Sequence, residues 1–526
     1  MYSILDQRLT WLFNADPRSL FDGRRIGLER EALRVAPDGY ISQISHPISL
    51  GSALTHPYIT TDYSESLLEF ITPPLPAIEE VVGFLDDIHR FVYGHIGDEL
   101  LWAASMPCIL AGEASIPIAE YGRSNLGFMK HVYRRGLAWR YGRIMQVIAG
   151  IHFNFSLPDA FWAAFQDQAG DRRSPQDFRS ESYFGLIRNL QRFGWLILYL
   201  FGASPAVCKS FLDGKSTALP EFDDHTCYGP YATSLRMSNI GYTNRTEKKS
   251  GVNVCYNSLA EYIASLTQAT AMPWPPYEKI GVKVDGDYRQ LNANVLQIEN
   301  EYYTSMRPKQ PPHGNEKPTL ALGRRGVQYV ELRSVDINPL DPLGVNESQL
   351  RFLEAFLLFC LLNESPPLDG EERRMIDANQ MAAALTGRDP GLVLQRRRPP
   401  SSPALRVWAG EILGLLQPVC ELLDFGEANR PYSVALAEQG EALADPDRTP
   451  SARMLAEMRA SGENFFRCAR RLSEQHRRFF EARPLAEERV RFFAEAAEQS
   501  LRAQRDIEAA DDVPFDEFLR GYFAQT

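Results

Sequence analysis

Two carboxylates lie close together in the stretch IGLEREALRV, residues 26–35. The stretch has the composition of a β-strand, and a strand turns successive side chains to opposite faces. Glu29 and Glu31 therefore share one face, ~7 Å apart at the rise of a strand. Two carboxylates at this separation repel each other unless cations offset their charge. A solvated strand face, with Arg30 and Arg34 as counter-charges, is the simpler explanation, so this stretch alone does not decide the matter.

Acidic residues and a histidine recur on further predicted strands. In THPYITTDYSESLLEFITPP, residues 55–74, Asp62, Glu65 and Glu69 lie in a segment that ends as an apolar strand. Strand alternation places Glu65 and Glu69 on the same face. His152 lies in the strand-like stretch IAGIHFNFSLP, which carries no other charge. Each has a simpler explanation when taken singly, because carboxylates are usually solvated and a lone histidine among apolar residues is more often a hydrogen-bonded core residue.

Taken together, these residues predict a cation site. A fourth strand, YVELRSV at residues 329–335, places Glu331 and Arg333 on one face. If the four strands belong to one sheet, five residues converge on it: Glu29, Glu31, Glu69, His152 and Glu331. Mg²⁺ and Mn²⁺ take oxygen ligands, Mn²⁺ also accepts imidazole, and Mg²⁺ often completes its shell with substrate phosphates. Arg333 would suit a phosphate oxygen in the same site. Because the chain has no G-x-x-x-x-G-K-[ST] motif, the pattern indicates metal-assisted phosphoryl transfer on a sheet rather than in a P-loop.

The elements that must position these side chains lie in the first two-thirds of the chain. Apolar periodicity predicts helices over 1–22, 76–98 and 183–203, and strands over 24–36, 67–72, 144–157 and 327–335. Residues 280–303 predict a hairpin that turns at Asp285–Gly286, followed by another strand. The basic, proline-rich residues 306–325 predict a loop.

After about residue 345 the sequence becomes mainly helical, with a proline-rich break near 395–405. The last long stretch, residues 485–510, is rich in helix formers and charges and predicts a solvated surface helix. We therefore expect a catalytic region over 1–365 and a mainly helical region over 366–526 that packs on the same body.

The composition limits the class of protein. Of 526 residues, 44% are hydrophobic and 23% charged, which is typical of a globular protein. The net charge of -11 argues against nucleic-acid or anionic-membrane binding. No apolar run approaches a membrane span, and the N-terminal residues lack a signal-peptide pattern. The seven cysteines form no C-x-x-C pair, so we expect buried or incidental thiols in a reducing cytoplasm.

Long blocks of the sequence, in order along the chain, resemble the proteobacterial family of glutamate–cysteine ligase (γ-glutamylcysteine synthetase). The resemblance is continuous from about residue 5 to about residue 365 and weaker over the helical remainder. The blocks are GLEREALRV, LGSALTHPYITTDYSESLLEFITP, FGASPAVC, PYATSLRMSNIGYTN, NVLQIENEYY, RPK and YVELRSVDINP. Position 63 is Tyr where the family would have Phe, which changes little.

The resemblance implies an α+β fold like the catalytic domain of glutamine synthetase. An antiparallel curved sheet would form a funnel-like active site, with helices outside. The implied metal ligands are Glu29, Glu31, Asp62, Glu69, His152 and Glu331. Arg333 would contact the transferred phosphoryl group of ATP and, with Glu331, act in catalysis. The implied substrate-binding residues are Tyr133, Arg134, Arg236, Tyr242 and Tyr303.

The implied reaction joins the γ-carboxyl of L-glutamate to the amine of L-cysteine through γ-glutamyl phosphate, as the first step of glutathione biosynthesis. It uses ATP as co-substrate and Mg²⁺, or Mn²⁺ in its place. We expect a cytoplasmic enzyme, a monomer or weak oligomer, that binds neither nucleic acid nor a membrane. Two other functions stay open: a carboxylate–amine ligase with a different acceptor, and a non-catalytic relative that senses ATP or a thiol. Identifying the product would distinguish a ligase with a different acceptor from glutamate–cysteine ligase. An ADP-release assay would distinguish a non-catalytic relative from an enzyme.

Overall fold

An antiparallel sheet of seven strands forms the centre of the computed structural model, which describes residues 3–241 and 250–525. The strand order is β11-β12-β5-β1-β3-β2, and β4 pairs with one end of β1. The strands are β1 (Arg25–Val35), β2 (Ile59–Thr61), β3 (Leu67–Ile71), β4 (Leu100–Leu101), β5 (Ile151–Ser156), β11 (Met306–Lys309) and β12 (Tyr329–Val335). The predicted α+β class with an antiparallel sheet is confirmed.

Strand β1 lies inside the sheet, because both of its edges are paired with neighbouring strands. Ten of its eleven residues are at least half-buried, and it pairs with β5 on one side and β3 on the other. The register sets Glu29 directly opposite His152 of β5, and Glu31 directly opposite Glu69 of β3. Directly opposed residues of antiparallel strands project to the same face. The pairing therefore gathers acidic side chains from separate segments onto one surface of the sheet.

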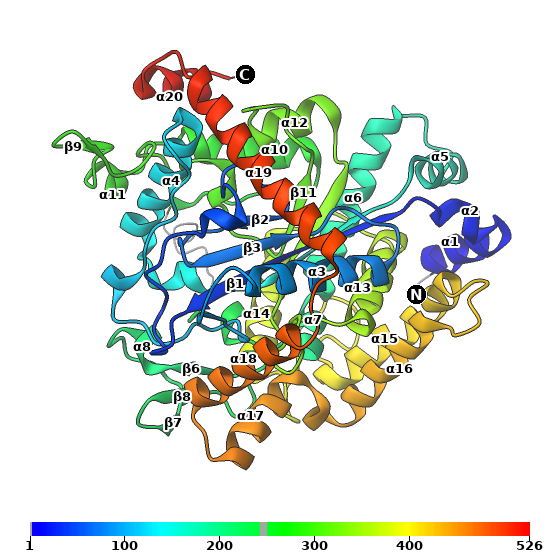
Figure 1. Ribbon diagram of the computed structural model, residues 1–526. Coiled ribbons are helices and arrows are strands. Elements are labelled where there is room, and N and C mark those ends of the chain that lie inside the picture. Colours follow the sequence, from blue (N-terminus) through cyan, green and yellow to red (C-terminus); the bar gives the residue numbers. More distant parts are fainter. Residues whose placement is uncertain (1–2, 242–249, 526) are drawn as a thin grey trace.

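Helices enclose the sheet and make up most of the C-terminal third (Figure 1). The helices before residue 330 are α1 (Ser3–Asn14), α2 (Pro17–Phe21), α3 (Ile78–Tyr93), α4 (Asn125–Tyr141), α5 (Asp159–Gln168), α6 (Pro175–Phe193), α7 (Trp195–Phe201), α8 (Lys209–Leu212), α10 (Leu259–Ala271), α11 (Pro275–Glu278) and α12 (Pro318–Arg325). The later helices are α13 (Glu347–Leu362), α14 (Gly370–Thr386), α15 (Leu405–Leu423), α16 (Pro431–Ala444), α17 (Pro450–Ser461), α18 (Phe465–Glu481), α19 (Glu487–Ala510) and α20 (Phe515–Phe523). One apolar core runs from Leu5 to Phe493, and α13, buried almost throughout, packs on α6, α15 and α16.

Two smaller sheets lie apart from the central one. Strands β6 (Ala206–Cys208), β7 (Glu221–Asp223) and β8 (Thr226–Tyr228) form the first. Strands β9 (Lys283–Val284) and β10 (Asp287–Tyr288) form the predicted hairpin, with both turn residues, Asp285 and Gly286, at positive φ. Positive φ at both central residues is what a tight two-residue hairpin requires, so the predicted turn is confirmed.

Several predicted elements differ from the structure. The single helix over 1–22 is two helices, α1 and α2, and the helix over 183–203 is divided at Gly194 into α6 and α7. The strand predicted from residue 144 begins only at Ile151, because Ile144–Val147 forms a 3₁₀ turn. No strand follows the hairpin up to residue 303; a 3₁₀ turn at Glu299–Glu301 stands there instead.

The largest error concerns residues 306–325, which were predicted as a loop. They begin with strand β11 and end with helix α12, and only the residues between are irregular. Pro308 suggested a loop because proline cannot donate a hydrogen bond within a sheet. It is tolerated here because β11 is an edge strand, paired on one side only with β12.

The C-terminal helix α19 also differs from its prediction as a solvated helix. It crosses the front of the molecule in Figure 1 and buries Phe493, Ala497 and Ser500. The Phe493 ring packs 5.7 Å from Phe84 of α3, and Ser500 Oγ accepts a hydrogen bond from the Ser52 amide. Most of its charged residues are exposed, so α19 is an amphipathic helix that joins the main core.

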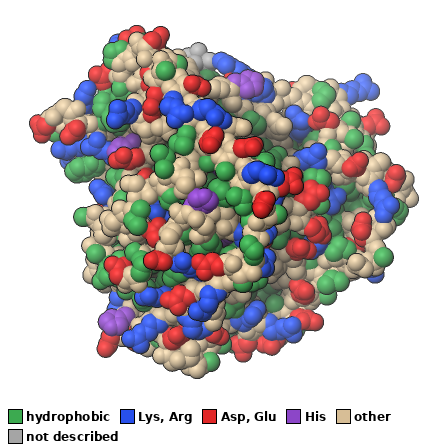
Figure 2. All heavy atoms as spheres, in the orientation of Figure 1, with side chains coloured by type: hydrophobic (Ala, Val, Ile, Leu, Met, Phe, Trp, Pro, Cys, Tyr) green, Lys and Arg blue, Asp and Glu red, His purple; other side chains and the backbone are tan. Residues whose placement is uncertain are grey.

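The distribution of surface charge and the burial of the cysteines match what the composition led us to expect. Basic and acidic side chains are interspersed over the face seen in Figure 2. Six cysteines are buried and Cys255 is half-buried, all as free thiols, as expected for incidental cysteines. Across residues 3–241 and 250–525, the helices lack the combined length and apolar character that crossing a bilayer needs.

Candidate active site

Three of the predicted residues meet on neighbouring strands at the centre of the sheet. His152 Nδ1 lies 2.9 Å from Glu29 Oε2 and 3.6 Å from Glu331 Oε1. One donor atom from each of these residues can be chosen so that all three lie within 4.8 Å of one another. Asn154 Nδ2 donates to the other oxygen of Glu29 at 2.9 Å, which fixes that carboxylate in place.

Glu331 is buried, and cations surround one of its two oxygens. Arg333 Nη1 lies 3.1 Å and Lys309 Nζ 3.3 Å from Glu331 Oε1. Burial works to raise the pKa of the Glu331 carboxyl, but Lys309 and Arg333 hold it well below its usual range. Its second oxygen, Oε2, is buried without a hydrogen-bond partner in the described residues. A buried carboxylate oxygen with no partner is costly, which favours a ligand there.

The other acidic residues extend the site along β1 and β3. Glu31 Oε2 accepts a hydrogen bond of 2.6 Å from the Gly150 amide, and Glu31 Oε1 lies 3.7 Å from His152 Nε2. Burial, followed by the neighbouring carboxylates of Glu29 and Asp62, raises the pKa of the Glu69 carboxyl well above its usual range. Glu29, Glu31, Glu69, His152 and Glu331 thus lie together on one face, as their sequence pattern suggested.

Glu65, from the same segment as Glu69, lies elsewhere. Its two carboxylate oxygens accept hydrogen bonds from the His46 and Glu120 amides, at 2.8 and 2.9 Å. It precedes the strand, in a turn, so the alternation that would place it beside Glu69 does not apply.

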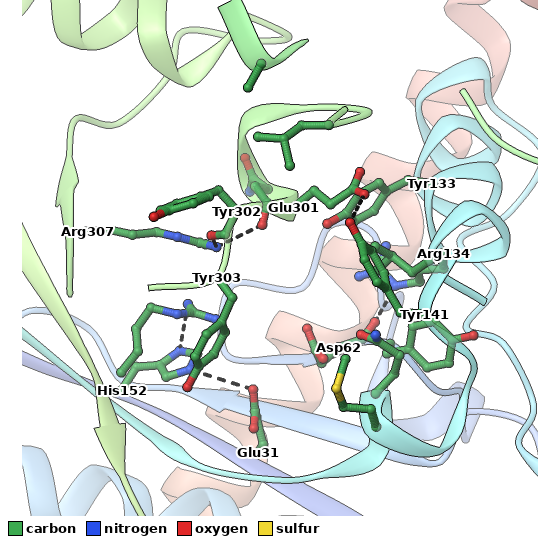
Figure 3. Close-up of a pocket in the computed structure, with 18 of the residues that line it drawn as sticks. Glu31, Asp62, Tyr133, Arg134, Tyr141, His152, Glu301, Tyr302, Tyr303 and Arg307 are labelled. Atoms are coloured by element: carbon green, nitrogen blue, oxygen red, sulfur yellow. Dashed lines mark hydrogen bonds and ion pairs between the residues drawn. The ribbon is translucent and has the colours of Figure 1, made fainter. Parts of the chain in front are cut away.

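A cavity opens over this face of the sheet, and Figure 3 shows how its walls differ. Helix α4 supplies Tyr133, Arg134 and Tyr141 on one side. Residues 302–307 supply Tyr302, Tyr303 and Arg307 on the other. Glu31 and His152 rise from the sheet, and Asp62 and Arg333 also line the cavity. Apolar side chains also line the cavity: Leu137, Met145, Val252, Val295 and Leu296. The cavity therefore joins an ionic floor to an amphipathic enclosure.

Arg236 lines the cavity but is also part of the support beneath it. Its Nη2 donates to the Arg333 carbonyl at 2.9 Å, and its Nη1 lies 3.6 Å from Asp336 Oδ1. A Cβ at Gly150 would lie 2.0 Å from Arg236 Nη2, so only glycine allows the guanidinium to lie there. Arg236 thus supports the backbone of β12 as well as facing the cavity.

The remaining predicted substrate residues lie as follows. Tyr303 Oη donates to the sulfur of Met237 at 3.0 Å, and burial raises the pKa of this phenol. Arg134 Nε donates to the Asp62 carbonyl, and its guanidinium stacks 4.6 Å from the Tyr121 ring. Tyr242, also predicted for this pocket, lies outside the described residues.

Two cations of the site, Arg307 and Lys309, were missing from the predicted set. Both lie on β11, where the register places Arg307 opposite Glu331. Arg307 Nη2 donates to the carbonyls of Asn300 and Tyr302, at 2.8 and 2.7 Å, which holds its guanidinium at the cavity. The alternation in MRPK places both cations on one face of a strand, but the loop prediction concealed this pattern.

The donor set at the centre of the site suits a hard divalent cation. Glu29 and Glu331 offer carboxylate oxygens and His152 offers an imidazole nitrogen. Mg²⁺ prefers oxygen donors, and Mn²⁺ accepts one imidazole in addition. Arg333, Arg307 and Lys309 lie beside these groups, where they can contact phosphate oxygens. The arrangement can hold a cation together with a polyphosphate.

Comparison with known proteins identifies the family. The family model for glutamate–cysteine ligase matches residues 9–383. The chain belongs to the glutamate–cysteine ligase family. It is 48% identical to the glutamate–cysteine ligase of Alcanivorax borkumensis over 524 residues, covering 99% of each chain. It is also 48% identical to that of Pseudomonas aeruginosa strain UCBPP-PA14, covering 100% of this chain and 98% of the relative. The predicted family is confirmed.

Solved structures show the same fold. The glutamate–cysteine ligase of Francisella tularensis, crystallised in complex with AMP, matches with a TM-score of 0.88 and 34% identity. That match covers 95% of this chain and 97% of the other. A bifunctional glutathione synthetase from Pasteurella multocida matches with a TM-score of 0.71 at 24% identity, covering 92% of this chain and 58% of that one. At that identity the second likeness shows the fold alone.

Proposed function

We propose that this protein is a glutamate–cysteine ligase. It joins the γ-carboxyl of L-glutamate to the amine of L-cysteine, converts ATP to ADP and phosphate, and forms γ-glutamylcysteine for glutathione biosynthesis. The observation that carries the proposal is the cluster of Glu29, His152 and Glu331 beside Arg333 in a chain of this family. We propose a cytoplasmic location, which the seven free thiols favour, and a monomer or weak oligomer.

The acidic residues on the sheet would hold the metal. Glu29, His152 and Glu331 form its centre, and the partnerless Oε2 of Glu331 is the atom that most needs a ligand. Glu31 and Glu69 are paired on the same face of the sheet and Asp62 lines the cavity, so we propose these three as further ligands. We propose Mg²⁺ as the usual ion, with Mn²⁺ as a substitute, because a single imidazole accompanies the oxygen donors. When bound, the ion neutralises and orients the phosphates.

The chemistry begins with activation of glutamate. A carboxylate is a poor electrophile toward an amine, so an oxygen of the γ-carboxylate first attacks the γ-phosphorus of ATP. The new O–P bond forms as the bond to the ADP oxygen breaks, which gives γ-glutamyl phosphate. Arg333, held by Glu331, donates to the phosphoryl oxygens as negative charge develops on them. Arg307 and Lys309, which both lie on β11, offset the remaining negative charge of the phosphate groups.

The second step forms the amide bond. The cysteine amine attacks the acyl carbon to give a tetrahedral intermediate. As this collapses to the amide, inorganic phosphate leaves with the C–O bonding electrons and the nitrogen loses one proton, which the departing phosphate accepts. We assign the acceptor to the side of the cavity bounded by Tyr133, Arg134 and Tyr303, with Arg236 below them. Enclosure by these side chains keeps water from the acyl phosphate, which would otherwise hydrolyse.

The test is product identification by mass spectrometry after incubation with ATP, Mg²⁺, glutamate and cysteine. We expect γ-glutamylcysteine and ADP in equal amounts, and neither when glutamate is omitted. ADP release without γ-glutamylcysteine, but with another amine as acceptor, would show a different carboxylate–amine ligase. A chain that binds ATP without releasing ADP under any of these conditions would be a non-catalytic relative, and the proposal would be wrong.

A further inference from the structure

A second apolar cluster, separate from the main core, joins the C-terminal helix α20 to helix α4. Leu519 is the buried residue of α20, and it packs with Met129 and Val132 of α4. The Phe515 ring meets the Phe128 ring edge to face, with centroids 4.6 Å apart. Such contacts between helices distant in sequence fix their relative position.

The segment between α19 and α20 holds the N-terminal end of α4. The Asn125 amide donates to the carboxylate of Asp511, and Asn125 Nδ2 donates to the Val513 carbonyl at 2.9 Å. One turn earlier on α19, Glu508 Oε1 accepts a hydrogen bond of 2.8 Å from the Arg123 amide. In Figure 1 this part of the chain lies directly beside α4.

The far end of α20 is also anchored. Lys317 Nζ donates to the carbonyls of Phe523 and Gln525, at 2.9 and 3.1 Å. Gln525 Nε2 donates to the Asn315 carbonyl at 2.9 Å. Both partners lie between β11 and α12, so α20 is fixed at each end and presses its apolar face onto α4.

Helix α4 transmits this position to the cavity. Tyr133 packs against the α20 cluster and also lines the cavity. Arg134, the next residue, donates from Nε to the carbonyl of Asp62. A shift of α4 would therefore move two cavity residues and loosen the hold on Asp62, although no residue of α20 lines the cavity.

We propose that α20 is a positioning element for the acceptor side of the active site. It acts through α4 by setting where Tyr133 and Arg134 lie. The family model ends at residue 383, so this role belongs to a part of the chain outside the matched region. That the affected substrate is cysteine rests on the proposed function.

The test uses Leu519→Ala in the full-length chain, with two matched variants. Leu519→Met keeps the apolar volume, and Glu517→Ala changes an exposed residue of the same helix. Steady-state kinetics and hydrogen exchange are measured on each. For Leu519→Ala we expect the KM for cysteine to rise at least about fivefold, because small displacements of binding groups are costly. The KM for ATP should change less than about twofold, and both control variants should behave like the wild type.

A second measurement asks whether the effect passes through Tyr133. In a Tyr133→Phe background, Leu519→Ala should add little to the KM for cysteine, because effects that share one route are not additive. Hydrogen exchange of Leu519→Ala should accelerate in α4 and not in the central sheet, and this readout does not depend on activity. If the wild type forms no γ-glutamylcysteine, the proposed function fails, and exchange in α4 alone decides the inference.

The outcomes that overturn the inference are distinct. An unchanged KM for cysteine with accelerated exchange throughout the chain would mean that α20 only stabilises the fold. Exchange in α4 equal to that of the wild type would also overturn it, and full additivity with Tyr133→Phe would overturn the part of the inference that concerns Tyr133. If Leu519→Ala does not yield folded protein, Phe515→Leu trims the same cluster more gently and carries the same expectations.

Discussion

Replacing Glu69 by Gln should stabilise the metal-free protein while abolishing most of its activity. Glu69 lies directly opposite Glu31 on the neighbouring strand, where Cβ atoms are about 5 Å apart. Two carboxylates ~6 Å apart repel by about 3 kcal/mol at an effective dielectric constant near 20. Protonation of Glu69, whose pKa is raised by burial and by nearby carboxylates, relieves part of this repulsion. The net gain in unfolding free energy for Glu69→Gln should therefore be about 1–2 kcal/mol.

The same substitution should weaken the response to metal. Wild-type protein at a Mg²⁺ concentration 100 times its Kd gains about 2.7 kcal/mol of stability. If the variant binds Mg²⁺ about 100-fold more weakly, the gain at that concentration falls to about 0.4 kcal/mol. The unfolding entropy of a chain of 526 residues converts 1 kcal/mol to roughly 1 °C in Tm. The Mg²⁺-induced rise in Tm should thus drop from roughly 2.5 °C to below about 0.5 °C.

Thermal unfolding at pH 8, with and without Mg²⁺, measures both effects, and steady-state kinetics give the activity. Glu65→Gln is the matched control, because it makes the same chemical change in a neighbouring turn. Its carboxylate accepts two amide hydrogen bonds, so this control should lower the Tm and leave the Mg²⁺ response unchanged. A lower metal-free Tm for Glu69→Gln, together with a wild-type Mg²⁺ response, would refute the assignment of Glu69 to the metal site.

Three further predictions concern the same site and the thiols. Glu331→Gln should destabilise the protein, the opposite of Glu69→Gln. We expect its free energy of unfolding, measured with denaturant, to fall by about 3 kcal/mol, because Arg333 and Lys309 lose their buried counter-charge. An unchanged unfolding midpoint would contradict this. Arg333→Lys should lower kcat about 100-fold with little change in the KM for ATP, since lysine lacks the planar two-pronged contact to phosphate; a change confined to the KM for cysteine would rule the role out. Cys255→Ser should retain most activity, because this half-buried thiol contacts Glu261 and Arg373 rather than the cavity; loss of activity in a folded variant would show that a protein thiol takes part in the reaction.

The sequence by itself determined which residues share a strand face. The period of two along a strand follows from backbone geometry, so Glu29 with Glu31, and Glu331 with Arg333, could be placed without knowing the fold. The electrostatic cost of such acidic faces then pointed to cations. The turn at Asp285–Gly286 was equally local, because only a few residue types accept positive φ at both central positions. Resemblance to a family added the reaction and the substrate-binding residues.

Only the tertiary structure decided which faces meet and what supports them. The register that sets Glu29 opposite His152, and Arg307 opposite Glu331, depends on pairing between segments far apart in the chain. The proline in MRPK concealed a strand, because whether a strand lies at a sheet edge is not a property of its own residues. The contact of α20 with α4 joins residues nearly 400 positions apart, such as Asn125 and Val513. Local periodicity sets the direction of a side chain, whereas its partners are chosen by packing of the whole chain.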